Sequence, residues 1–580
     1  MSGSPTFIEK HGLWSDEQKR LAAEIARRVE AEELRFVRLA WGDAHGYSRA
    51  KTLTVPAFLS ALTGGYNIGV ATTTLDSAGA RVFASFTRGG GMGLDEMTGS
   101  PNLTIVADPS TFRALPWAQG VGWVLGDEYF NDGRPFHFSP RQLLRKALGA
   151  LGERGFRSVI GTEIEWYLLR VADGHLSDDN IGAPGFRGSA IATRPVEPGY
   201  HYHSETNMDL MQPVFDALAD AFAALGLGLR SIENEWGPGQ VECTFAPRHA
   251  LEAADNVLLF RTATRQICRR LGYFATFMCR PALKGFCSSG WHLHQSLTDA
   301  STGANLFVPQ KSGDVLSPLG QSYLAGLLHY ATPSTAFAAP TVNGYRRFRP
   351  NSLAPDRATW AYDHRGTMIR VLGGLDDPAT RLENRTGEPS ANPYLFILSQ
   401  IIAGVAGIEA KAMPPPPNDE PYAAERPLLP KSLPEALDAS TMSRCSAARS
   451  AIRSLTISSS SSAAKREGIC ARLNRPEHRH QATKRARGSK MSISISFRGD
   501  SAAVCRAATE AAARISLSRP MVIRSQAPDG RTAPRSQGKS STGTPLTGGR
   551  KNAIVSLKFS VHPGNSGLGA ADFAGRSWQA

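Results

Sequence analysis

The sequence predicts an α+β fold, because segments with strand and helix periodicity mix without the regular strand–helix–strand repeat of a parallel sheet. Two further observations support this class. The chain has no internal repeat. It also lacks the Gly-rich phosphate loops GxxxxGK[ST] and GxGxxG, so P-loop and dinucleotide-binding domains are weak interpretations.

The first part of the chain predicts one helix followed by short strands. Residues 16–34 carry mixed charges at helical spacing and form an amphipathic helix. The apolar run 35–41 ends in Gly42-Asp43-Ala44-His45-Gly46, whose Gly and Asp residues favour a turn, and 50–55 returns as a second strand. The pattern stays rich in strands and turns to about residue 130.

Longer elements follow. Proline at its start favours a helix at 140–154, a long apolar strand covers 158–172, and the Gly-, Pro- and Asp-rich stretch 172–204 is expected to be a loop. The remaining elements are expected in this order: a helix at 207–225, a hairpin at 229–246, a helix at 250–271, a strand at 291–297, a helix near 318–330, strands at 342–349, 368–374 and 380–385, and an apolar helix at 392–409.

Charge is distributed unevenly. Residues 1–440 carry 41 Lys and Arg against 45 Asp and Glu, whereas the last 140 carry 24 against 6, a net charge of +18. Together with a pentaserine and little periodicity, this composition predicts that 440–580 is a disordered Ser/Arg-rich tail, for which a shifted reading frame is a further hypothesis. Because the positive charge lies in this tail, nucleic-acid binding is not favoured.

Other classes of protein are also disfavoured. No apolar run of about 18 residues predicts a membrane span, and the N-terminus lacks the pattern of a signal peptide, so we expect a cytoplasmic protein. Seven cysteines without CxxC spacing indicate free thiols rather than a zinc site.

Carboxylate, imidazole and guanidinium groups gather in four segments with strand character. They are Glu163 and Glu165; Glu235 and Glu242; His292, His294 and Ser296; and Arg381, Glu383 and Arg385. Side chains two residues apart share one face of a strand, so these groups indicate one site for a divalent metal and an anionic substrate. Each segment alone has a simpler interpretation: an exposed acidic edge strand, a solvent-separated carboxylate pair, or a hydrogen-bonded core histidine.

The spacing around Pro238-Gly239 adds to this argument. If these two residues form the whole turn, Glu235 and Glu242 lie directly opposite each other on one face. Like charges that face each other across a hairpin are destabilising. We therefore expect a cation between them, most simply a divalent ion with oxygen ligands.

Arginines are dense between residues 346 and 385. Solvation explains some of them, but arginine also binds carboxylates and phosphates bidentately. With carboxylates for divalent ions and no evident Cys or Ser nucleophile, the set favours phosphoryl chemistry by metal clamping and positioning.

Together these segments closely resemble glutamine synthetase over roughly residues 30–435. The matching segments are GTEIEWYLL, ENEWGPGQVE, SSGWHLHQSL, VNGYRRFRPNSLAP, DHRGTMIR, TRLENR and ANPYL. The resemblance implies an N-terminal β-grasp domain (1–134), a glutamine-synthetase-like catalytic domain (135–439) and a homo-oligomeric ring, commonly a dodecamer. It also implies an ATP-dependent ligase that joins the side-chain carboxylate of glutamate to ammonia or an amine through an acyl phosphate. A catalytically silent scaffold or metabolite sensor is the alternative.

The resemblance also implies a role for each matching residue. Two or three Mg²⁺ or Mn²⁺ ions are expected at each site, the first on Glu165, Glu235 and Glu242, and the second on Glu163, His292 and Glu383. ATP is expected on His294, Ser296, Arg370 and Arg381, and the glutamate substrate on Gly290, Arg347 and Arg385. Arg347, Arg365 and Asp43 are the expected catalytic residues, Asp43 being donated by a neighbouring subunit to help deprotonate the amine.

One position departs from the family's pattern. In enzymes that use ammonia, the loop before Ala354-Pro355 carries a glutamate that helps to form the ammonium pocket. Here that position is Leu353. An apolar side chain offers no negative charge to ammonium, so we expect a larger or less charged amine, as in the related γ-glutamyl–amine ligases.

Overall fold

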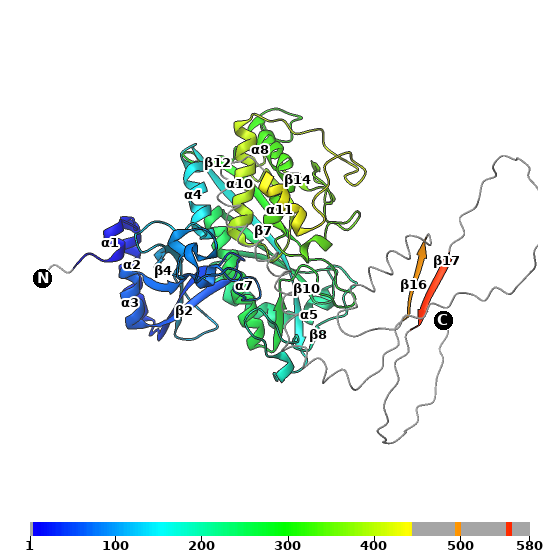
Figure 1. Ribbon diagram of the computed structural model, residues 1–580. Helices are drawn as coiled ribbons and strands as arrows, with labels where there is room; N and C mark the ends of the chain where they lie inside the picture. The colour runs from blue at the N-terminus through cyan, green and yellow to red at the C-terminus, as the bar shows by residue number, and fades with distance from the viewer. Residues whose placement is uncertain (1–3, 443–493, 500–552, 559–580) are drawn as a thin grey trace, which may run out of the picture. The chain divides into compact units, whose positions relative to one another are not determined.

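The structure is a computed structural model that describes residues 4–442, 494–499 and 553–558 (Figure 1). The chain forms two compact units, Met1–Glu467 and Gly468–Ala580. In the second unit, β16 (Ser494–Gly499) and β17 (Ala553–Lys558) pair as an antiparallel ladder. Apart from these strands and residues 440–442, the predicted disordered tail lies outside the described residues.

The N-terminal part of the first unit is a curled six-stranded sheet with the strand order β2-β1-β6-β4-β3, and β5 pairs with β6. Its strands are β1 (Phe36–Gly42), β2 (Ser48–Thr54), β3 (Tyr66–Gly69), β4 (Asn102–Ala107), β5 (Arg113–Ala114) and β6 (Val121–Tyr129). Its helices are α1 (Phe7–His11), α2 (Asp16–Ala31) and α3 (Val55–Gly64). The predicted first helix and the β1–β2 hairpin are confirmed, and α3 was not predicted.

A nine-stranded sheet follows, with the order β13-β14-β15-β12-β7-β10-β9, and β8 and β11 pair with β7. Its strands are β7 (Phe156–Val171), β8 (Thr193–Pro195), β9 (Leu229–Asn234), β10 (Gln240–His249), β11 (Tyr273–Thr276), β12 (Trp291–Asp299), β13 (Trp360–Tyr362), β14 (Ile369–Leu372) and β15 (Arg381–Gly387). With the helices below, these sheets confirm the α+β class.

Helices pack against this larger sheet and against one another (Figure 1). They are α4 (Pro140–Gly152), α5 (Glu205–Asp209), α6 (Gln212–Leu225), α7 (Ala250–Arg270), α8 (Pro318–His329), α9 (Ala331–Ala338), α10 (Pro393–Glu409) and α11 (Leu433–Met442). Along β7, Ile164, Trp166 and Leu168 lie in the core that these helices close. Because side chains alternate along a strand, Glu163 and Glu165 project to the opposite face.

Two predicted elements are wrong in detail. The helix predicted at 207–225 is interrupted between α5 and α6, and α6 restarts with a proline in its first turn. The strand predicted at 342–349 is instead a 3₁₀ turn at Gly344–Arg346. Side-chain hydrogen bonds hold this turn: Glu388 accepts from the Thr341 amide (2.8 Å), and Asn343 accepts from the Arg280 amide (2.6 Å). Such bonds compete with strand pairing.

The predicted domain boundary at 134/135 falls in the connection between β6 and α4. Both sheets nevertheless belong to one compact unit, so the division into two domains stays a prediction. Within the described part of the chain, no helix has the length and apolar character needed to cross a membrane.

Candidate active site

Strand pairing brings most of the predicted metal ligands onto one face of the larger sheet. The pairs that lie opposite each other are Glu165 and Glu242, Glu163 and His292, and Glu383 and His294. The strands involved are adjacent, in the order β15-β12-β7-β10. Residues that lie opposite each other share a face, so the side chains form one band across the sheet.

The predicted register of the hairpin is wrong. β9 and β10 set Glu242 opposite Glu233, not Glu235, because the tip has four residues, 236–239, instead of two. The tip is closed by the Glu235 amide, which donates to the Gln240 carbonyl oxygen at 2.9 Å. Glu235 therefore directly precedes the tip and lies diagonal to Glu242 across the hairpin, where its charge still acts on the cluster.

His292 is the centre of the carboxylate cluster. Its Nδ1 lies 3.3 Å from Glu163 Oε2, 3.8 Å from Glu383 Oε1 and 4.0 Å from Glu242 Oε2. Its Nε2 lies 3.8 Å from Glu165 Oε1. Four carboxylates thus surround one buried imidazole, which is the convergence that the strand alternation predicts.

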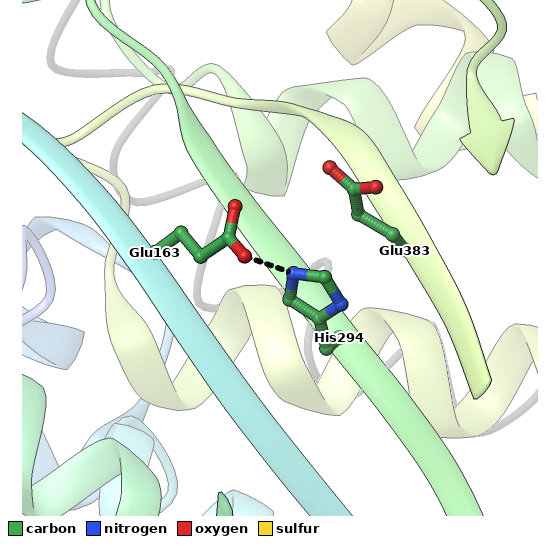
Figure 2. Close-up of side chains that lie close together, drawn as sticks. All are labelled: Glu163, His294 and Glu383. Atoms are coloured by element: carbon green, nitrogen blue, oxygen red, sulfur yellow. Dashed lines mark hydrogen bonds and ion pairs between the residues drawn. The ribbon is translucent and has the colours of Figure 1, made fainter. Parts of the chain in front are cut away.

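Two sets of three side chains have ligand atoms that all lie within 4.8 Å of one another. The first is Glu163, Glu242 and His292. The second is Glu163, His294 and Glu383, which point toward one another from three adjacent strands (Figure 2). His294 Nε2 lies 2.8 Å from Glu163 Oε1. His294, which the resemblance assigns to ATP, is therefore also within reach of a metal site.

The acid–base properties of the cluster suit a cation. Burial, and then repulsion by Glu165, raises the pKa of Glu235 to about 8 and that of Glu242 to about 10. A divalent ion between these carboxylates would offset the repulsion that otherwise favours their protonated forms. Carboxylate oxygens with an imidazole nitrogen form a donor set compatible with Mg²⁺ or Mn²⁺, so the residues present fit the expected metal.

Two other carboxylates of the cluster are held ionised. Burial acts to raise the pKa of Glu163, but hydrogen bonds to His292 and His294 bring it well below its ordinary value. Burial opposes ionisation of Glu383 in the same way, but the Arg385 charge and both histidines lower its pKa to about 2. The cluster therefore contains carboxylates that carry charge at neutral pH.

Arginines line the same band. Arg385 donates to Glu383 Oε1, and Arg370 Nη1 donates to Glu383 Oε2 at 3.0 Å. Arg381 Nε donates to His294 Nδ1 at 3.1 Å. These side chains place guanidinium groups beside the carboxylates, as binding of a phosphate next to a metal requires.

Arg347 reaches the other side of the cluster. Its Nη2 lies 3.4 Å from His292 Nε2, and its Nη1 donates to the Arg385 carbonyl oxygen at 2.5 Å. Gly290 makes room for it, because a Cβ at that position would lie 2.4 Å from Arg347 Nη2 and 3.0 Å from Glu165 Oε1. The absence of a side chain at Gly290 is therefore a requirement of this packing.

Four other predicted residues lie outside the carboxylate cluster of this chain, and for Asp43 this is no contradiction, because it is expected to serve a neighbouring subunit. Asp43 is buried in the β1–β2 turn, where its carboxylate accepts from the His45 amide (2.9 Å) and from Arg49 Nε (2.8 Å). Ser296 follows His294 on β12, farther along the strand. Arg365 is an exposed loop residue. Leu353 is also exposed, and its carbonyl oxygen accepts from Arg385 Nη2 at 3.4 Å.

Gln240 is a site residue that the sequence argument missed. It is buried, and its Nε2 donates to Glu165 Oε2 at 2.8 Å and to Ser289 Oγ at 3.0 Å. The side-chain amide therefore fixes the orientation of one predicted metal ligand. Its position beside Glu242 in the hairpin motif was a signal that could have identified it.

Comparisons with known proteins agree with this geometry. The family model described as the catalytic domain of glutamine synthetase matches residues 137–468. This match extends beyond Ala439, the predicted end of the catalytic domain. The chain is 44% identical over 443 residues to gamma-glutamylanilide synthase from Acinetobacter sp, covering 76% of this chain and 88% of that protein. It is 31% identical over 409 residues to glutamate–isopropylamine ligase from Pseudomonas sp, covering 70% and 84%. A solved structure titled "Apo GmaS without ligand" aligns with a TM-score of 0.62 at 25% identity, covering 78% of this chain and 96% of that chain.

Proposed function

The chain belongs to the glutamine synthetase family and is an ATP-dependent glutamate–amine ligase, and from this premise we propose that its amine substrate is a neutral arylamine of the aniline class. The observation that carries the proposal is Leu353, which is exposed and whose carbonyl oxygen accepts from Arg385, an arginine of the cluster. Leucine offers no charge to ammonium. An arylamine is uncharged at neutral pH because its nitrogen lone pair is delocalised into the ring, so it needs no carboxylate.

The relatives support this substrate class. The Acinetobacter protein, at 44% identity, is named for an anilide product. The Pseudomonas protein, named for the branched alkylamine isopropylamine, is 31% identical. The amide bond therefore forms with an amine other than ammonia in both relatives, and the higher identity favours the aromatic one.

The reaction has two steps. A side-chain carboxylate oxygen of glutamate attacks the γ-phosphorus of ATP, which gives γ-glutamyl phosphate and ADP. The amine nitrogen then attacks the acyl carbon, inorganic phosphate leaves, and the nitrogen loses a proton to give the amide. Bound divalent cations would supply positive charge to the phosphate oxygens during the transfer.

The site residues receive roles within this proposal. Arg347 and Arg385 would hold the carboxylate and the developing charge of the glutamate substrate, supported by their burial beside His292. Arg370 and Arg381 would contact the phosphates of ATP, with His294 and Ser296. The exposed Arg365 would reach the transferring group from its loop. Charge stabilisation of this kind is usually the largest catalytic contribution.

Two or three Mg²⁺ or Mn²⁺ ions are part of the proposal. Glu165, Glu235 and Glu242 would hold one, and Glu163, His292 and Glu383 a second. The short distances around His292 support the second set, and the pairing of Glu165 opposite Glu242 supports the first.

A cytoplasmic homo-oligomeric ring, of the dodecameric kind, completes the proposal. Within its own chain Asp43 is enclosed by its turn and by Arg49, which lies 2.7 Å from its carboxylate. A role for Asp43 in deprotonating the amine would therefore need a neighbouring subunit and an opening of this turn.

The amine preference can be tested with the wild-type protein and two variants of Leu353. We expect aniline to give a higher kcat/KM than ammonia or isopropylamine in an assay of glutamate-dependent phosphate release. Leu353→Glu is expected to lower kcat/KM for aniline about tenfold and to raise it for ammonia, because a carboxylate attracts ammonium. Leu353→Gln, which is polar but uncharged, is the matched control. A wild-type preference for ammonia would refute the proposal.

Gly290 provides a test of the packing around the proposed glutamate site. Gly290→Ala is expected to lower kcat/KM for glutamate about 10- to 100-fold, because the new methyl group displaces Arg347 and Glu165. Gly149→Ala in α4 is the matched control, since a Cβ there meets no atom within 4 Å. Equal activity of the two variants would argue against the role of Arg347.

A further inference from the structure

Two exposed aromatic side chains stack on each other beside the carboxylate cluster. Trp236 lies in the β9–β10 tip, directly after Glu235, and Tyr202 lies in the loop before α5. Their rings are 5.0 Å apart and inclined by only 7°. Trp236 is 47% exposed and Tyr202 44% exposed, whereas most aromatic side chains in the described part of the chain are more deeply buried. An aromatic surface that remains open beside an active site requires an explanation.

The loop that carries Tyr202 is firmly attached to the hairpin tip. The buried carboxylate of Glu197 accepts from the Gly199 amide of the loop and from the Gly239 amide of the tip. The Tyr200 amide donates to the Trp236 carbonyl oxygen at 3.3 Å. The space between the two segments is tight, because a Cβ at Gly199 would lie 2.9 Å from the Pro238 nitrogen. Hydrogen bonds and close packing between the two segments therefore hold the stacked pair in place.

The stack adjoins the reaction centre. Trp236 directly follows Glu235 in the chain. Tyr202 lies close enough to Glu235, Glu242 and Arg365 for their charges to act on its phenol. After the effect of burial, these nearby carboxylates raise the pKa of Tyr202 to about 12, so the hydroxyl stays protonated. The neighbouring His203 stacks on Tyr202 at 3.8 Å, with its Nε2 3.2 Å from Glu233. The aromatic surface thus borders the proposed metal site on the β9 side of the sheet.

We propose that Trp236, held in place by its stack on Tyr202, is the surface on which the arene ring of the amine substrate stacks, which makes Trp236 a specificity-determining residue and Tyr202 a residue that positions it. This inference rests on the proposed arylamine function. A flat ring stacked on Trp236 would keep its amino group near Glu235, beside the cluster where the acyl phosphate forms. Aromatic pairs prefer such offset-stacked arrangements, with centroids 4.5–7 Å apart.

The adenine ring of ATP is the competing occupant, and the strand order disfavours it. The proposed ATP residues lie on β12, β14 and β15, whereas the stack lies at the end of β9. β7 and β10 separate β12 from β9, a distance of about 14 Å at ordinary strand spacing.

The test compares two amines of similar size, planar aniline and the saturated ring of cyclohexylamine. Trp236→Leu, which keeps apolar volume but removes the ring, is expected to lower kcat/KM for aniline about tenfold. Trp236→Phe, which keeps a ring, is expected to restore it to within about threefold of wild type. With cyclohexylamine, and for the KM of ATP, Trp236→Leu should change the value less than about twofold. Tyr202→Leu should follow the same pattern.

Phe36→Leu is the matched control, because Phe36 is similarly exposed but lies at the start of β1. Equal losses with both amines in Trp236→Leu would overturn the inference, since they would assign to Trp236 a general role in holding Glu235. A raised KM for ATP would also overturn it and would point to adenine. A failure of the arylamine proposal itself would be recognised separately, because the wild-type protein would then prefer ammonia or isopropylamine to aniline.

Discussion

Replacing Glu383 by glutamine is expected to lower kcat/KM at least about 100-fold. Glu383 is completely buried and accepts hydrogen bonds from Arg370 and Arg385. Its Oε1 also lies 3.8 Å from Nδ1 of His292. Glutamine has nearly the same shape but no charge, so Arg385 loses its counter-charge, Arg370 keeps only Asp363 as an anionic partner, and a divalent cation loses an anionic ligand. Removal of one preorganised electrostatic group commonly costs about 100- to 1,000-fold in rate.

The measurement is ATP-, glutamate- and amine-dependent phosphate release, together with a Mn²⁺ titration followed by calorimetry. Because neighbouring charges lower its pKa to about 2, Glu383 of the wild type is ionised throughout the assay range, and the loss of activity in the variant should be the same at every assay pH. Glu409→Gln is the matched control, since Glu409 is exposed and pairs with Arg154 away from the cluster. Activity within about threefold of wild type, with unchanged Mn²⁺ binding, would contradict the assignment of Glu383.

The stability of the Glu383 variant must be measured in parallel. Removing one partner of a buried ion pair commonly costs about 3–5 kcal/mol. Glutamine still accepts one hydrogen bond, so a smaller loss in the free energy of unfolding is expected. A folded protein with weak Mn²⁺ binding would attribute the loss of activity to the site and not to unfolding.

The convergence of the metal ligands could be predicted from the sequence because it depends on a local rule. The period of two along β7, β12 and β15 sets which side chains share a face, whatever the strand length. Glu163, His292 and Glu383 therefore met as expected. The order of the strands in the sheet was not predicted, since periodicity alone does not determine which strands become neighbours.

The register of the β9–β10 hairpin could not be predicted in the same way. It depends on the length of the tip, and Pro238-Gly239 suits either a two-residue turn or the end of a longer one. The structure selects the four-residue tip, in which the Gly239 amide bonds to Glu197, a residue more than 40 positions earlier. A local pattern contains no information about such a distant partner.

The prediction of a strand before Arg347 failed for the same reason, because distant contacts determine the local structure. Residues 342–349 were predicted as a strand, but Thr341 and Asn343 bond to Glu388 and Arg280, which lie 47 and 63 positions away. Holding the turn with Glu388 has an energetic cost, because burial disfavours the charged carboxylate and raises its pKa to about 7. The fold keeps this carboxyl group buried to hold the turn that carries Arg347.

A buried charge network joins the N-terminal sheet to the catalytic part, and its centre is Arg141. This arginine, on α4, donates from Nη2 to Asp108 (2.7 Å), from Nη1 to Asp127 (3.0 Å) and from Nε to Asp255 (2.9 Å). Asp108 follows β4, Asp127 lies on β6, and Asp255 lies on α7. Three separate elements are thus held by one guanidinium group. Asp255 also accepts from the Tyr394 hydroxyl on α10 at 2.8 Å.

Arg141→Met is therefore expected to lower the free energy of unfolding by about 3–5 kcal/mol, because buried aspartates lose their main counter-charge. Urea unfolding monitored by circular dichroism measures this loss. Arg154→Met is the matched control, since Arg154 and Glu409 form an exposed pair, and should cost less than about 1 kcal/mol. A loss in Arg141→Met no larger than in the control would show that the network does not join the two parts energetically.

The pH dependence of the free energy of unfolding gives a second, independent test of the Arg141 prediction. In the wild type, burial acts to raise the pKa of Asp108, but the Arg141 charge lowers it well below its ordinary value. Its stabilising contribution is then complete above the unfolded pKa of about 3.9 and is lost only at lower pH. In Arg141→Met, Asp108 loses this neighbouring charge while it stays buried, so its pKa should rise and it should bind a proton as the pH falls through the new value. The difference in unfolding free energy between wild type and variant should therefore be smaller at pH 5 than at pH 8. A difference that grows toward pH 5 would mean that the aspartates are not the source of the instability.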